Sequence, residues 1–423
     1  MYRYLPIRDI YAREITDSRG NPAFEAEVLA GEDIVGRASV SAGILAEGYE
    51  AARSRDWKNG NMERTMEQAV EYVNAELAQA ILGLNVFDQA ELDKVLSKSA
   101  CNFDKRNLRV NTILGISMAA ARTAATALKL PLYRYLGGMR TKRMPIPMFS
   151  ILDGGIYAEN TFDIQEVLLI PGKTKNYREG FCICTKVYQS LKEILKEKTD
   201  VVRTGAAGGF APDLTDVKEA LELTEEAVKR AGCQMKQDIS IVLHTAASRL
   251  YNADRKVYDF PGESKRKGQK IIRSTEEWLS YYEELAERFP IDLIEEPLGN
   301  NDREGWEKIE ERLGGKVQLA ADVPCTEDIQ NSAKEGQVKT VDTVVLNLAQ
   351  MGTLSEALDV SESARKAGKQ TILSCRCGGT EDTMLADAAV AFRTDYIKVG
   401  APWGTERTAQ YNQLLRIEED MGF

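Results

Sequence analysis

The pattern of apolar and polar positions divides the chain into two parts. Residues 7–29 alternate with the two-residue period of half-buried strands on either side of a turn at 17–22, and residues 34–40 continue the alternation. From residue 62 to residue 136 the apolar positions instead recur with the helical period. Strands followed by helices predict a first domain of the α+β type, which we expect to span residues 1–138.

The second part, residues 139–423, repeats a short apolar run followed by an amphipathic helix. Runs that are apolar throughout are typical of parallel strands covered by helices. Eight such runs are present, at 147–152, 166–170, 239–244, 291–297, 317–322, 343–348, 371–377 and 396–400. Eight strands are enough to close a β/α barrel. The predicted fold class is therefore α/β, a barrel at 139–423 with an N-terminal α+β capping domain.

A doubly wound open sheet is the alternative for this second part. Such sheets bind nucleotides through a glycine-rich loop after an early strand. No such loop follows an early run here, so we rank the open sheet below the barrel.

Polar residues stand where the predicted strands end. In a β/α barrel the active site lies at the mouth formed by these ends. Reading them gives His244, Glu295, Asp322, Asn347, Cys375 with Arg376, and Lys398. Glu166 opens the second run, and it would face the same mouth if that strand ran antiparallel.

Three of these residues suggest a metal site. His244 is the only histidine of the chain, and Glu295 and Asp322 end the next two strands. Two carboxylates and one imidazole suit Mn, Fe or Zn better than Mg. The alternatives are solvated strand ends, or an internal ion pair between His244 and one of the two carboxylates. Lys398 and Arg376 could hold a carboxylate or phosphate.

The composition limits the partners that we expect. The net charge is −10 and no basic stretch carries interleaved aromatic residues, so we expect no nucleic-acid partner. The longest apolar runs have the length of strands, so we expect no membrane partner. Charges in the first residues argue against a signal peptide, and the seven scattered cysteines read as reduced thiols, so we expect a cytoplasmic protein.

Several segments resemble the signatures of enolase, and the likeness covers nearly the whole chain. They are AREITDSRGNP at 12–22, LPLYRYLGG at 130–138, IEEP at 294–297, QMGTLSE at 350–356, GTEDT at 379–383 and NQLLRIEE at 412–419. The resemblance implies an enolase-like barrel with a capping domain and the activity of a phosphopyruvate hydratase. In that reaction a lysine removes the proton beside a carboxylate, two Mg²⁺ ions hold the product dianion, and a glutamate helps hydroxide to leave.

The resemblance also implies a homodimer. The first hairpin, around Arg13 and Arg19, would contact Glu418 and Glu419 of the C-terminal helix in the other copy. Opposite charges would make this two-fold contact self-complementary.

Compared position by position, however, several of the family's catalytic, metal-binding and phosphate-binding residues are replaced in this chain. The base lysine falls at Asn347, the glutamate of the GDEGG motif at Ala207, and the hydroxyl that ligates the second metal at Leu45. The GGSHA histidine falls at Tyr157, and the His-Arg-Ser of the phosphate pocket at 375–377, Cys-Arg-Cys. Asparagine cannot accept a proton, alanine cannot assist a leaving group, and leucine cannot bind a metal.

The metal trio and the retained residues complete this comparison. The family's Asp, Glu and Asp metal ligands fall at His244, Glu295 and Asp322, and the resemblance implies Mg there. Three further residues keep the family's identity, namely Glu166, Arg376 and Lys398.

These replacements favour a rebuilt lyase that acts on a small carboxylate or phosphorylated acid. Lys398, Glu166 and Tyr157 would be its catalytic residues, and Arg376, Lys398 and Cys375 would bind the substrate. We expect poor or absent dehydration of 2-phosphoglycerate, since general acid–base groups contribute ~10²–10⁴-fold each. A non-catalytic enolase-like binding or assembly protein is one alternative. A phosphopyruvate hydratase with relocated catalytic residues is the other.

Overall fold

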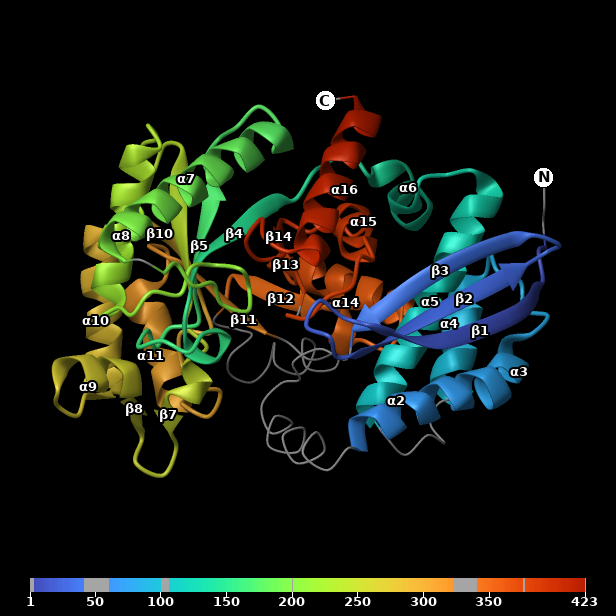
Figure 1. The fold of residues 1–423 in the computed structure, drawn as a ribbon, viewed down its shortest axis with the longest axis horizontal. Helices are drawn as coiled ribbons and strands as arrows, with labels where there is room; N and C mark the ends of the chain where they lie inside the picture. The colour runs from blue at the N-terminus through green and yellow to red at the C-terminus, as the bar shows by residue number, and fades with distance from the viewer. Residues whose placement is uncertain are drawn as a thin grey trace.

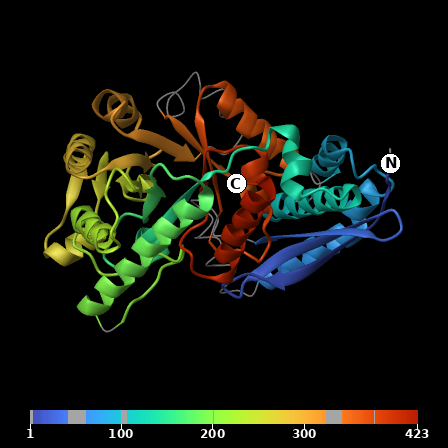
Figure 2. The same cartoon turned by 90° about the horizontal axis from the view of Figure 1, so that it is seen from above.

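The computed structural model describes residues 4–41, 61–99, 106–199, 201–322, 341–375 and 377–422. A small α+β cap lies against one side of a β/α barrel (Figure 1, Figure 2). The fold class expected from the sequence is confirmed. In the described ranges no helix is both long and apolar enough to cross a membrane.

The cap is an antiparallel sheet covered by helices. The strands are β1 (Ile7–Thr16), β2 (Pro22–Ala30) and β3 (Ile34–Ser41), paired in that order, as the alternating pattern predicted. The helices are α2 (Asn61–Tyr72), η1 (Val73–Leu77), α3 (Ala78–Ile81), α4 (Gln89–Ser99) and α5 (Arg106–Leu128).

Helix α5 packs directly on β2 and β3. Gly36 permits this close approach, because a Cβ atom there would lie 2.3 Å from the backbone nitrogen of Thr123. The short helices α6 (Leu132–Gly137) and η3 (Gly138–Arg140) then lead into the barrel, and the domain division at residue 138 stays a prediction.

The barrel closes with eight strands, as the sequence predicted. They are β4 (Ile146–Asp153), β5 (Glu166–Pro171), β6 (Ile239–His244), β10 (Ile291–Glu295), β11 (Gln318–Asp322), β12 (Thr343–Asn347), β13 (Gln370–Ser374) and β14 (Tyr396–Lys398). Strand β5 pairs antiparallel with both neighbours, and the other pairings are parallel. Glu166 at the start of β5 therefore lies at the same end of the barrel as His244 at the end of β6.

Helices cover the outside of the barrel. They are α7 (Tyr177–Lys198), α8 (Val217–Arg230), α10 (Thr275–Arg288), α11 (Arg303–Leu313), α14 (Leu354–Lys366), α15 (Met384–Ala391) and α16 (Thr405–Met421). A separate cluster of buried apolar side chains from the strands, among them Met148, Leu168, Val242 and Ile372, packs within the sheet. It gives the polar mouth an apolar floor.

The sequence reading missed a second small sheet between β6 and α10. It consists of β7 (Tyr251–Asn252), β8 (Val257–Asp259) and β9 (Ile272–Ser274), with α9 (Pro261–Lys267) inserted before β9. The expected direct step from strand to helix is wrong here. Strands of two or three residues are too short for their period to be read from the pattern.

Cap and barrel are joined by a half-buried ion pair. Arg122 of α5 donates to both carboxylate oxygens of Asp382 at 2.6 and 2.7 Å, and the backbone nitrogen of Ser39 in β3 donates to the same carboxylate at 2.8 Å. These bonds hold β3 beside the barrel mouth.

The C-terminal helix α16 carries Glu418 and Glu419, the two acidic residues of the expected dimer contact. Glu418 is 3% exposed, and its carboxylate accepts hydrogen bonds from the first backbone nitrogens of α7, those of Tyr177 and Arg178. It therefore faces its own chain. Glu419 is exposed, as is Arg19. The homodimer itself stays a prediction.

Candidate active site

The polar residues read as strand ends lie together at one end of the barrel. His244, Glu295, Asp322, Asn347 and Lys398 are the last residues of β6, β10, β11, β12 and β14. The strand register sets Glu166 opposite His244 and His244 opposite Glu295. Cys375 follows β13, whereas Arg376 and Leu45 lie outside the described residues.

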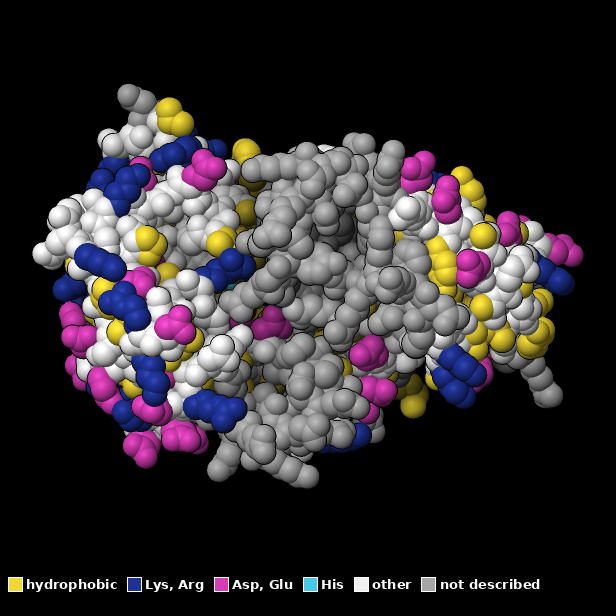
Figure 3. All heavy atoms as spheres, turned by 90° about the horizontal axis from the view of Figure 1, so that it is seen from below, with side chains coloured by type: hydrophobic (Ala, Val, Ile, Leu, Met, Phe, Trp, Pro, Cys, Tyr) yellow, Lys and Arg dark blue, Asp and Glu magenta, His cyan; other side chains and the backbone are white. Residues whose placement is uncertain are grey.

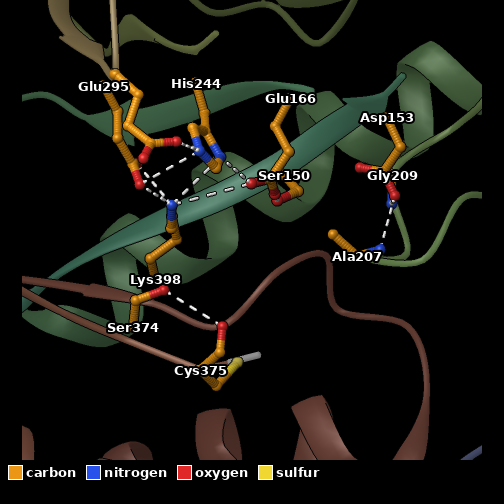
Figure 4. Close-up of polar contacts among 11 residues, drawn as sticks. Ser150, Asp153, Glu166, Ala207, Gly209, His244, Glu295, Ser374, Cys375 and Lys398 are labelled. Atoms are coloured by element: carbon orange, nitrogen blue, oxygen red, sulfur yellow. Dashed lines mark hydrogen bonds and ion pairs between the residues drawn. The ribbon is translucent and has the colours of Figure 1, made fainter. Parts of the chain in front are cut away.

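Glu166, His244, Glu295 and Lys398 form a buried charged cluster at the mouth (Figure 4). The half-buried Glu296 joins this cluster through His244. The Nζ atom of Lys398 lies 2.5 and 2.6 Å from the two carboxylate oxygens of Glu295 and 4.0 Å from Oε2 of Glu166. It also lies 3.4 Å from Nδ1 of His244. The lysine therefore sits between the imidazole and two carboxylates.

The imidazole of His244 contacts a carboxylate on each side. Its Nδ1 lies 2.8 Å from Oε2 of Glu166, and its Nε2 lies 3.3 Å from Oε2 of Glu296 and 3.6 Å from Oε1 of Glu295. Ser150 of β4 donates to the other oxygen of Glu166 at 2.5 Å. The expected alternative of an ion pair between His244 and Glu295 thus describes part of what is observed, and Glu166 is the nearer partner.

Neighbouring charges shift the pKa values of three members of the cluster, His244, Lys398 and Glu166. Burial alone would lower the pKa of His244, but the negative charge of Glu295 and the bonds to Glu166 and Glu296 raise it to about 9. Burial opposes the charge of Lys398 too, yet Glu295 and Glu166 raise its pKa. Burial would raise the pKa of Glu166, and the hydrogen bond from His244 with the charge of Lys398 lowers it. His244 and Lys398 are therefore cations at neutral pH, and the lowered pKa of Glu166 keeps its carboxylate ionised.

The described residues do not fit a divalent ion between His244, Glu295 and Asp322. The ammonium of Lys398 contacts both oxygens of Glu295, and both imidazole nitrogens of His244 are directed at carboxylates. Asp322 lies two residues further along its strand than the partner of Glu295, and its carboxylate accepts from Gln350 at 3.4 Å. Within the described ranges no group of three His, Cys, Asp or Glu residues is arranged to hold a metal. Binding at these residues stays a prediction.

Asn347 and Ala207 occupy the positions where the family resemblance implies a base and a leaving-group acid. The side chain of Asn347 accepts a hydrogen bond from the backbone of Ala349 at 3.0 Å, so it caps the turn after β12. Ala207 belongs to a glycine-rich loop, 205–209, and presents no ionisable group.

The side chains of Asp153 and Arg407 hold that loop in place. Asp153 at the end of β4 accepts from the backbone nitrogens of Ala207 at 2.8 Å and Gly209 at 3.2 Å. Arg407 donates to the carbonyl of Ala207 at 3.0 Å from the other side. A Cβ at Gly209 would lie 2.4 Å from Asp153, which explains the glycine. Burial and the charge of Glu166 raise the pKa of Asp153.

A cavity of about 140 Å³ opens between the cap and this end of the barrel. Its lining includes Glu166 and Lys398 of the charged cluster. Both residues contact His244, which is not part of the lining. The rest of the lining comes from both domains and includes Ser39, Ser41, Tyr157, Ala207, Asn347, Cys375 and Arg407. The cavity thus brings together the expected residues Glu166, Lys398, Tyr157 and Cys375.

The thiol of Cys375 is not activated. Burial raises its pKa to about 11, and its sulfur lies 3.3 Å from the carbonyl oxygen of Val399. A neutral thiol is a poor nucleophile, so Cys375 can shape the cavity but gains no reactivity from its surroundings.

Sequence reasoning missed four residues at this site, namely Ser150, Asp153, Glu296 and Arg407. Asp153 could have been found by the strand-end rule, but the predicted strand stopped one residue earlier. Glu296 turns back to His244 because its φ angle is +48°, and no sequence signal predicts a left-handed glutamate.

Charge on the surface is mixed. Figure 3 shows that basic and acidic side chains alternate over the described part of the barrel seen there, without gathering by sign.

Two family models match the chain in sequence order. Residues 7–136 match the N-terminal domain of enolase, and residues 141–423 match the C-terminal TIM barrel domain of enolase. The matched ranges contain the cap sheet, all eight barrel strands and the charged cluster. The chain therefore belongs to the enolase family.

Proposed function

We propose that this enolase-family protein is a lyase for a small carboxylic acid and that it dehydrates 2-phosphoglycerate poorly or not at all. One observation carries the proposal: Lys398 and Glu166 line one cavity at the barrel mouth, while Asn347 and Ala207 stand in the same lining where a base and an acid are expected. The cavity keeps charged groups that suit an acid but has lost the groups suited to this dehydration.

Lys398 is the group that would bind the acid's carboxylate. Its raised pKa keeps it protonated, so it can attract an anion or donate a proton, but it cannot serve as a base. Part of its attraction to Glu295 must be given up when the substrate binds. We therefore expect weak, charge-dependent binding of small acids.

Glu166 lines the cavity beside Lys398, and it is the carboxylate that would accept a proton from the carbon beside the substrate carboxylate. The C–H electrons then form the new double bond, and the leaving group departs with its bonding electrons and a proton from Tyr157 or Lys398. Because the pKa of Glu166 is lowered, it is a weak base, and we expect slow turnover.

Enolases generally bind Mg²⁺. In this chain His244, Glu295 and Asp322 would be the ligands of a divalent ion, which would stabilise negative charge on the substrate, and the imidazole would favour Mn, Zn or Fe. The contacts of Lys398 and His244 oppose such binding, so none of the residue roles above depends on it.

A non-catalytic binding protein is the second candidate, and Asn347 favours it. Its side chain caps a turn and cannot transfer a proton, so the family's base position lines the cavity without a base. Such a protein would bind an acid in the cavity without converting it.

The test combines binding and turnover on the full chain. We expect calorimetry with a panel of small carboxylic acids to find a ligand whose affinity falls at least tenfold in Lys398→Met, and spectrophotometry to show its slow conversion. Binding without conversion would favour the non-catalytic candidate. Rapid conversion of 2-phosphoglycerate by protein free of host enolase would mean that the catalytic residues have been relocated.

A further inference from the structure

We propose that the cavity at the barrel mouth selects a monocarboxylic acid with a short apolar tail over phosphorylated and dicarboxylic acids. The carboxylate head lies at Lys398, and the tail lies against an apolar wall of the cavity. This inference rests on the proposed function, because it assumes that Lys398 binds the carboxylate of the acid.

The apolar wall consists of five side chains from the cap and the barrel. Leu114 and Met118 stand about one turn apart on α5, so both lie on the same face of that helix. Leu348 follows β12, and Met384 and Leu385 begin α15. None of the five residues is more than 8% exposed. An aliphatic tail gains free energy when it leaves water for such a wall, whereas a second charged group would lose its hydration there.

The charged part of the lining comes from the ends of barrel strands. Lys398 ends β14 and Glu166 begins β5, and Nζ of the lysine lies 4.0 Å from Oε2 of the glutamate. A carboxylate held by Lys398 therefore has one negative side chain beside it already. The rest of the ligand is best uncharged, and it extends toward the apolar wall.

The described lining offers one cation to a ligand. Its other cation, Arg407, donates to the carbonyl oxygens of Ala207 and Ala206 at 3.0 Å each and pairs with Glu406. Lys398 is therefore the described cation that can meet an anion. A monocarboxylate matches one cation, whereas a phosphorylated acid or a dicarboxylate brings further negative charge without a partner.

Three lining positions have lost polar groups that the family resemblance implies. Ala207 stands in place of a glutamate, Cys375 in place of a histidine and Cys377 in place of a serine. Burial raises the pKa of Cys375 to about 11 and that of Cys377 to about 12, so both thiols stay neutral. A buried neutral thiol behaves as a small apolar side chain. These replacements make the lining less suited to a phosphate and better suited to an aliphatic ligand.

The first experiment measures the binding of straight-chain acids to the full chain by isothermal titration calorimetry. From acetate to pentanoate we expect the affinity to rise about three- to fivefold per methylene and to level off once the tail fills the cavity. Succinate is the matched control for butanoate, since a carboxylate replaces the terminal methyl group, and it should bind at least tenfold more weakly. Equal or tighter binding of succinate or of 2-phosphoglycerate would overturn the proposal.

The second experiment changes the size of the apolar wall at Leu385, which is its most exposed member. Leu385→Val leaves more room, so the best-bound acid should become about one carbon longer. Leu385→Phe fills the room, and it should weaken pentanoate at least tenfold while changing acetate less than threefold. The control is Leu130→Ala, at an exposed leucine outside the described lining, which should leave the series unchanged. The same length dependence in both Leu385 variants as in the wild type would overturn the proposal. The comparison of butanoate with succinate needs no variant, so it decides the matter if a variant does not fold.

Lys398→Met separates this inference from the proposed function. It removes the cation and leaves the apolar wall, so it should weaken every acid of the series by a similar factor of at least ten. Affinity that depends on Lys398 but not on the length of the tail would overturn this inference alone. Equal affinity in Lys398→Met and the wild type, or binding of none of the acids, would overturn both proposals.

Discussion

The Nδ1 atom of His244 lies 2.8 Å from Oε2 of Glu166, although one residue ends its strand and the other begins its strand. This contact exists because β5 runs antiparallel to β6 and the register sets the two residues opposite each other. The single reversed strand thus adds the first residue of a strand to a mouth that is otherwise built from strand ends.

Removing the imidazole should destabilise the protein. His244→Ala would leave Glu166 buried with Ser150 as a donor but without its nearest cation, and the loss of one partner of a buried pair costs about 3–5 kcal/mol. Urea unfolding at pH 7 measures this loss in the free energy of unfolding. His244→Gln, which can still donate to Glu166, should lose clearly less. Equal losses in both variants would show that the lost volume matters and the bond does not.

Dehydration of 2-phosphoglycerate by the wild type should be at least about 10⁴-fold slower than by an enolase that keeps its base and acid. The reason is that Asn347 and Ala207 cannot transfer a proton. Absorbance of the enol product gives the rate. Lys398→Met prepared in the same way is the control, because activity that is identical in both proteins comes from the host's own enolase.

Much of the fold follows from the periods in the sequence. The alternating pattern of the cap identifies strands such as β1, in which one face is buried and the other exposed. The barrel runs are apolar throughout and identify strands such as β6, which is buried on both faces. The sheet of β7, β8 and β9 could not be predicted, because its strands contain two or three residues and are held by long-range pairing.

The site was predictable only as a set of positions. Strand ends identified His244, Glu295 and Lys398, but the sequence does not state which side chain reaches which. The contact of Lys398 with Glu295 joins residues 103 positions apart and depends on the closure of the barrel. Glu296, whose carboxylate contacts His244, has a positive φ angle that glutamate rarely adopts.

The homodimer expected from the family should be visible in light scattering at micromolar concentration as twice the chain mass of 47.0 kDa. Glu418 caps α7 and is buried, so Glu418→Gln should lower stability without changing the mass. Arg19→Glu, at an exposed position, should instead favour the monomer. A wild-type mass of one chain would contradict the prediction.

Asp387 should make stability fall as the pH rises. It is buried in α15, and burial, only partly offset by Arg122, raises its pKa to about 6. The folded state then binds the proton more tightly than the unfolded chain. Its contribution is fully present below about pH 4 and is lost as the pH rises through 6, which costs ~3 kcal/mol at pH 7.

Asp387→Asn should therefore stabilise the protein at pH 7 by up to ~3 kcal/mol and have little effect at pH 4, since the amide can still bond with Gln413. Urea midpoints at both pH values test it. Asp359→Asn, on an exposed helix position, is the control and should show no such difference. A gain that is equal at both pH values would rule out the charge as its cause.

The pair between Arg122 and Asp382 should hold the cap on the mouth. Asp382 is bonded to both guanidinium nitrogens and to the backbone of Ser39, which lines the cavity, so losing the cation loosens one wall of the site. Arg122→Met should lower the free energy of unfolding by about 3 kcal/mol, because it leaves a buried carboxylate unpaired. Arg143→Met removes an exposed pair with Asp395 and should cost less than about 1 kcal/mol.

The same two variants separate stability from function. Arg122→Met should weaken binding of the acid and speed proteolysis between cap and barrel under conditions where the protein remains folded, since the cavity wall at Ser39 and Ser41 is then free to move. Arg143→Met should change neither. If acid affinity were unchanged in Arg122→Met, the cavity would have to be completed by the barrel alone, and the cap would contribute shape without contributing to binding.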